Sequence, residues 1–136
     1  MVSFIAEAEM AVAVQEPTTS VDFVAEAVID VYRAQVAEAT HMSLAEFIDS
    51  PRSVGSFRAI VAADTHTVEV ILDSESPIHD LSEVVWTVAT RGWHCNVLVS
   101  LDRLGTAHTE LRGTPCSLQG WWFEDDSVHF TGHERP

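Results

Sequence analysis

The chain has 136 residues, and its 21 aspartates and glutamates outnumber its seven lysines and arginines, so that the formal net charge is −14 at pH 7. Every one of these cations is an arginine, and they are spread along the chain from Arg33 to Arg135. Sequence-specific nucleic-acid binding is excluded, because it needs clustered cations that face the phosphates. The charge instead attracts a basic protein as partner and repels other copies of the chain, so assembly of the chain with itself would have to rest on an apolar surface.

The length and apolar content predict one α+β domain that spans residues 1–136, because a chain of this size rarely builds two separate cores. We find no apolar run of 18 residues and no signal-peptide pattern at the start. The expected location is therefore the cytoplasm, or a virion if the chain derives from a phage, and no membrane contact is expected.

The first half of the chain predicts a strand within residues 2–14, a long helix from Ser20 to about Ala39, and a short helix that Ser43 caps. The long helix has apolar residues at helical spacing, and further apolar residues widen this face beyond one stripe. The stripe consists of Val21, Val24, Ala25, Val28, Tyr32 and Val36, and the additional residues are Phe23, Ala27, Ile29 and Val31.

The second half predicts a hairpin from residues 57–63 and 67–72, a helix from Asp80 to Gly92 and a buried strand at 93–100. Residues 101–112 have the 3-4-3 spacing of a helix, and a second hairpin joins 117–124 to 128–131. The order predicts a two-layer domain, in which helices cover one face of a mixed, mostly antiparallel sheet.

Cys116, His129 and His133 have the spacing of the second half of a two-Cys two-His zinc finger, but no cysteine stands two to four residues before Cys116. A site of another kind, formed by these three residues and Cys95, stays open as an alternative. We expect no metal and no cofactor, because cysteines in apolar strands are usually small buried side chains.

No catalytic motif for a nucleophile, a phosphate loop or a dinucleotide is present, and we expect no catalytic residues and no enzyme activity. Aromatic residues are more informative. Trp121 and Trp122 are consecutive in a predicted strand, so their side chains must point to opposite faces. The predicted interface residues are Phe23, Ile29, Trp86 and Trp122, because large apolar side chains outside the core stripe are typical of protein interfaces.

We therefore expect a non-enzymatic structural protein that assembles into a homo-oligomer or ring. The size and element order are similar to those of small ring-forming proteins at the head-to-tail junction of tailed phages, a similarity of fold that assigns no residue. Two alternatives remain open. One is an acidic protein of the immunity or antitoxin type that neutralises a basic partner. The other is a small metal-dependent enzyme that uses Cys95, Cys116, His129 and His133.

Overall fold

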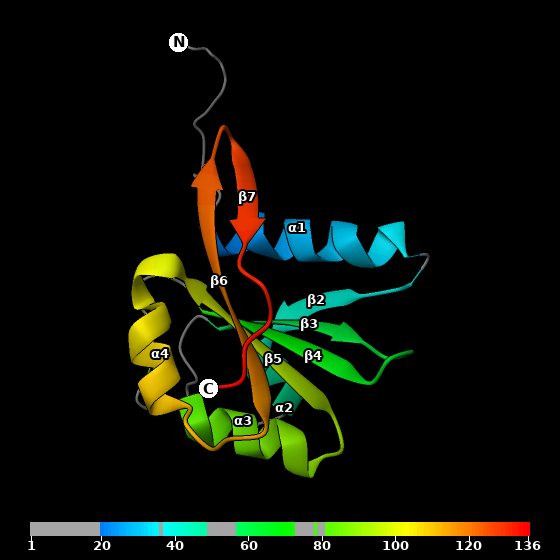
Figure 1. Ribbon diagram of the computed structural model, residues 1–136. Helices are drawn as coiled ribbons and strands as arrows, with labels where there is room; N and C mark the ends of the chain where they lie inside the picture. Colours follow the sequence, from blue (N-terminus) through cyan, green and yellow to red (C-terminus); the bar gives the residue numbers. More distant parts are fainter. Residues whose placement is uncertain (1–19, 36, 49–56, 73–77, 79–80) are drawn as a thin grey trace.

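The computed structural model describes residues 20–35, 37–48, 57–72, 78 and 81–136. Figure 1 shows its helices and strands. In chain order they are α1 (Ser20–Ala34), β2 (Thr40–Ser43), α2 (Leu44–Ile48), β3 (Arg58–Ala62), β4 (Thr67–Ile71), α3 (Leu81–Thr90), β5 (His94–Ser100), the 3-10 turn η1 (Leu101–Arg103), α4 (Leu104–Glu110), β6 (Cys116–Glu124) and β7 (Ser127–Phe130).

Within the described residues, six strands form one sheet in the order β2-β3-β4-β5-β6-β7. The pairs β2/β3, β3/β4 and β6/β7 are antiparallel, whereas β4/β5 and β5/β6 are parallel. Parallel neighbours need a crossover connection, which α3 provides between β4 and β5 and α4 provides between β5 and β6. The α+β class and the mixed, mostly antiparallel sheet are thus confirmed.

The expectation that all helices lie on one face of the sheet is wrong for α1. Figure 1 shows α1 on one side of the sheet and α2 and α3 on the other. Crossover connections between parallel strands are almost always right-handed, and the order β4-β5-β6 runs in one direction, so α3 and α4 must share a face. Because α1 belongs to no crossover, it is free to cover the opposite face.

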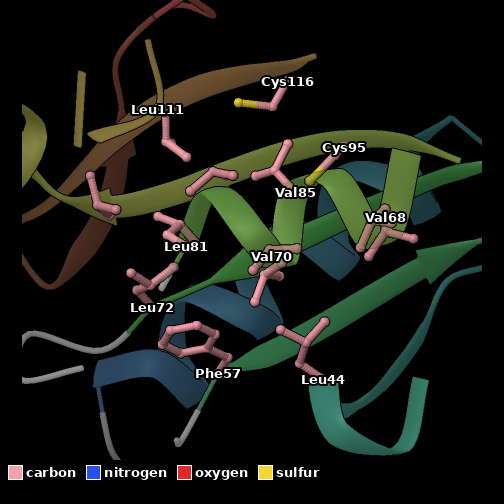
Figure 2. Close-up of a cluster of buried hydrophobic side chains, with 14 of the residues drawn as sticks. Leu44, Phe57, Val68, Val70, Leu72, Leu81, Val85, Cys95, Leu111 and Cys116 are labelled. Atoms are coloured by element: carbon pink, nitrogen blue, oxygen red, sulfur yellow. The ribbon is translucent and has the colours of Figure 1, made fainter. Parts of the chain in front are cut away.

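A separate core lies on each side of the sheet. Under α2, α3 and α4 the core contains Val68 and Val70 of β4 and Val97 and Val99 of β5. Figure 2 shows part of it, with strand residues such as Val70 beside Leu81 and Val85 of α3. Under α1 the core contains Ile60, Ile71, Leu98 and Trp121, together with the inner side of the helix. The central strands are therefore buried on both faces.

Local sequence signals explain where several elements begin and end. Ser43 Oγ accepts a hydrogen bond from the Glu46 amide, and Glu46 Oε1 accepts one from the Ser43 amide, which is a capping box at the start of α2. Gly92 and Gly113 have φ values of 87° and 81°, which glycine adopts without a steric penalty after α3 and α4. Both predicted hairpins and the helix within 101–112 are confirmed.

Two boundaries differ from the prediction. The helix α1 ends at Ala34 rather than near Ala39, and residues 40–43 form the edge strand β2, which we did not predict. The sequence of β2, Thr-His-Met-Ser, is short and lacks apolar alternation, so it has no strand signal of its own; pairing with β3 makes it a strand. The predicted strand at 2–14, Val36 and Asp80 lie outside the described residues.

Candidate functional site

Four polar side chains lie on the α1 side of the three central strands. Glu69 of β4 pairs in register with Asn96 of β5, and Asn96 pairs with Ser117 of β6. Gln119 follows Ser117 by two residues and so shares its face. We call Glu69, Asn96, Ser117 and Gln119 the polar row. Glu69 is 8% exposed and Asn96 is 4% exposed, so these two side chains lie in the interior, whereas Ser117 and Gln119 are half-buried.

Hydrogen bonds connect the whole row. The Asn96 amide Nδ2 donates to Glu69 Oε1 at 2.6 Å and to Gln119 Oε1 at 2.8 Å. Ser117 Oγ donates to Asn96 Oδ1 at 2.7 Å, and the Tyr32 hydroxyl of α1 donates to Glu69 Oε2 at 2.6 Å. Each carboxylate oxygen of Glu69 therefore receives one hydrogen bond from a neutral donor.

Which group donates in the hydrogen bonds of the Gln119 and Asn96 amides follows from the backbone carbonyl of Thr131. Gln119 Nε2 donates to the carbonyl oxygen of Thr131 at 2.9 Å, and a carbonyl only accepts. The Gln119 oxygen must then accept from Asn96, whose amide in turn faces Glu69. Both neighbours of Glu69 therefore donate to its carboxyl oxygens.

Tyr32 is the only contribution of α1 to this network among the hydrogen bonds of the described residues. Burial raises the pKa of the Tyr32 phenol above its ordinary value of 10.0, and the hydrogen bond and the charge of Glu69 raise it further. Tyr32 thus stays protonated at neutral pH and keeps donating to the carboxylate.

A pocket of about 240 Å³ lies between α1, the sheet and the segment that follows β7. Its lining combines apolar side chains with Glu69, Gln119 and two aromatic rings. The lining residues are Val28, Val31, Tyr32, Gln35, Glu69, Leu98, Gln119, Phe130 and His133. In the part of the chain that the structure describes, the ion pairs are Arg33 with Asp30, Arg58 with Asp22 and His108 with Glu134, so none of them neutralises Glu69.

The predicted interface residue Phe23 is on the outside of α1 and is 52% exposed. Its ring packs edge-on against Phe123 near the end of β6, with 6.2 Å between the ring centroids, and Phe123 is 45% exposed. We call these two residues the aromatic patch. Sequence reasoning missed Phe123, because only the tertiary structure brings β6 to the beginning of α1.

Ile29 is wrong as an interface residue, because it is 7% exposed and packs into the core under α1. The helical spacing of the sequence already indicated that Ile29 lies on the buried side of α1. Ile29 follows Ala25 by four residues and therefore lies one turn further on the same buried side.

The remaining predicted interface residues are the two tryptophans outside the core. Trp86 is 51% exposed on α3. Trp122 is half-buried and stacks on His129, and its indole nitrogen donates to Glu124 at 3.3 Å. Trp121, the preceding residue, is buried under α1, so the predicted alternation of the tryptophan pair is confirmed.

Cys95, Cys116, His129 and His133 do not come together. The two cysteines are register partners on β5 and β6, and both are free thiols in the core under α3, where burial raises their pKa values. His129 instead stacks on Trp122, and His133 lines the pocket beside α1. Over the described residues, no group of three or more His, Cys, Asp or Glu side chains could hold a metal ion.

The sequence contained a signal for the polar row that we did not use. Glu69 stands between Val68 and Val70, and Asn96 stands between Cys95 and Val97. A polar residue within a strand that is apolar on both sides is either exposed or held in a buried network. Because helices cover both faces of the sheet, Glu69 and Asn96 are held in a buried network.

Models of known protein families, curated proteins and solved structures were each compared with the chain, and none of the three comparisons gives a match. Of the helices described, none has the length and apolar character needed to span a membrane.

Proposed function

We propose that this chain is a non-enzymatic binding protein that docks a basic protein partner through the aromatic patch. The observation that carries this proposal is that Phe23 and Phe123 pack against each other while about half of each side chain remains exposed. Aromatic side chains at the centre of a contact supply much of the energy of protein interfaces.

The charges beside the patch favour a basic partner over a second copy. Exposed carboxylates lie close to both rings in the sequence, because Glu26 follows Phe23 by one helical turn, and the turn residues Asp125 and Asp126 come shortly after Phe123. A basic surface would complement this rim, whereas a second copy would bring like charges together. The net charge of −14 acts in the same direction at longer range.

A homo-oligomer or ring is the second candidate, and Trp86 is the observation that favours it. A closed ring uses head-to-tail contacts, which require two different surfaces on each subunit. The exposed Trp86 side chain belongs to α3, and α3 lies across the sheet from α1 and the aromatic patch. One subunit thus presents exposed aromatic side chains in both helical layers.

Sedimentation velocity of the pure chain at low and high salt separates these candidates. A binder of a basic partner should remain monomeric at every salt concentration. A ring should assemble further as salt screens its negative charges. A stable multimer that dissociates in a Phe23→Asp variant would contradict the first candidate and support the second.

Capture of a basic protein by the immobilised chain then tests the patch itself. We expect Phe23→Asp and Phe123→Ser to lose the captured protein, and added salt to release it from the unmodified chain. Thr106→Asp is the matched control, because Thr106 is exposed on α4, on the other side of the sheet. Equal capture by Phe23→Asp and the unmodified chain would contradict docking at the patch.

A further inference from the structure

The pocket beside Glu69 contains a negative charge without a partner of opposite sign among the described residues. The carboxylate is 8% exposed, its two hydrogen bonds come from the neutral groups of Tyr32 and Asn96, and the ion pairs of the described residues leave it out. A buried charge is costly unless a counter-charge or several hydrogen bonds compensate it. A cation that enters the pocket would supply the missing charge.

The other side chains that line the pocket indicate what kind of body is attached to the cationic group. Val28, Val31 and Leu98 offer aliphatic surface, and Tyr32 and Phe130 offer aromatic rings. Aromatic rings attract organic cations, and aliphatic surface favours a ligand with an apolar body over a hydrated metal ion. The volume of about 240 Å³ lies below the range of about 300–1,000 Å³ that drug-sized ligands occupy, which points to a smaller molecule.

We infer that this pocket binds a small organic cation, an ammonium group on a short aliphatic or aromatic body. The ammonium group donates to the oxygens of Glu69, each of which has a free lone pair beside its existing hydrogen bond. The polar row holds the carboxylate in place before the ligand arrives, so binding does not have to order it. The site is separate from the aromatic patch and does not depend on the proposed partner.

The test is a titration with benzylammonium, followed by NMR of the side-chain amides of Asn96 and Gln119, both of which belong to the polar row. Benzyl alcohol is the uncharged probe of nearly the same shape, and benzoate is the anionic one. We expect saturable shifts of both amides with benzylammonium in physiological salt, weaker binding of benzyl alcohol and no binding of benzoate.

Two variants locate the binding site. Glu69→Gln keeps the shape and removes the charge, and it should weaken benzylammonium binding by about tenfold or more. Val31→Trp should block the pocket without disturbing the core, because Val31 lines the pocket and is 50% exposed. Ala34→Trp is its matched control, since Ala34 is exposed on the same helix outside the pocket lining, and binding to it should be unchanged.

Three results would overturn the inference. The first is no saturable binding of benzylammonium to the unmodified chain. The second is equal affinity for benzylammonium and benzyl alcohol, which would mean that the carboxylate does not select charge. The third is an undiminished affinity in Val31→Trp, which would place the binding of this cation elsewhere on the acidic surface.

Discussion

The two faces of the sheet are made from alternate residues of the same strands, yet they differ in chemistry. Under α2, α3 and α4 the central strands contribute apolar side chains such as Val70, Val97 and Leu118. Under α1 the same strands contribute the polar row and the pocket beside apolar residues such as Leu98. The face under α2, α3 and α4 provides packing alone, whereas the face under α1 combines packing with a charged group that borders a pocket.

The largest expected effect in this comparison comes from leucines on the two faces. Leu118→Ala should lower the free energy of unfolding by about 2–5 kcal/mol, because it opens a cavity in a fully buried apolar core. Leu98→Ala should cost less, since Leu98 already borders the pocket and water can fill the space that the truncation leaves. Urea unfolding measures both values, and an equal or larger loss for Leu98→Ala would contradict the difference between the faces.

A smaller effect is expected from the centre of the polar row. Asn96→Ala removes hydrogen bonds to Glu69, Gln119 and Ser117 and should cost about 1–3 kcal/mol, because buried polar groups lose their partner. Ser117→Ala is the control at the end of the row and should cost about 1 kcal/mol. If the two variants unfold at the same urea concentration, the row does not act as a connected network.

The smallest expected effect on stability near neutral pH comes from Cys95 and Tyr32. These two residues lie on opposite faces of the sheet, and each makes stability depend on pH. Burial raises both pKa values above the ordinary 9.0 and 10.0, so the unfolded chain loses each proton first, and stability falls as pH rises. The fall in stability caused by the Cys95 thiol, under α3, should begin at a lower pH than the fall caused by the Tyr32 phenol.

Urea unfolding between about pH 8 and pH 11 tests this order. Cys95→Ala should remove part of the fall that begins near the thiol value of 9.0, and Tyr32→Phe should remove only the part that begins near 10.0. A stability that stays constant across this range would show that neither group gains protons on folding.

Much of the secondary structure was predictable, because its signals are local. The sequence predicted that Ser43 caps a short helix, and Ser43 and Glu46 form a capping box there. The apolar stripe predicted for α1 lies on the buried side of the helix, but Ile29, which we wrongly assigned to an interface, is buried beside it. The strand β2 was not predictable in the same way, because its four residues become a strand only through pairing with β3.

By itself, the sequence determined the acidic charge, the α+β class and the type of most elements, since these depend on composition and on residues close together in the chain. Only the tertiary structure decided that α1 covers the second face, that the register aligns Glu69 with Asn96 and Ser117, and that Phe23 meets Phe123. The physical reason is that strand register and helix placement depend on contacts between distant residues, which together satisfy the buried polar groups and cover both apolar faces.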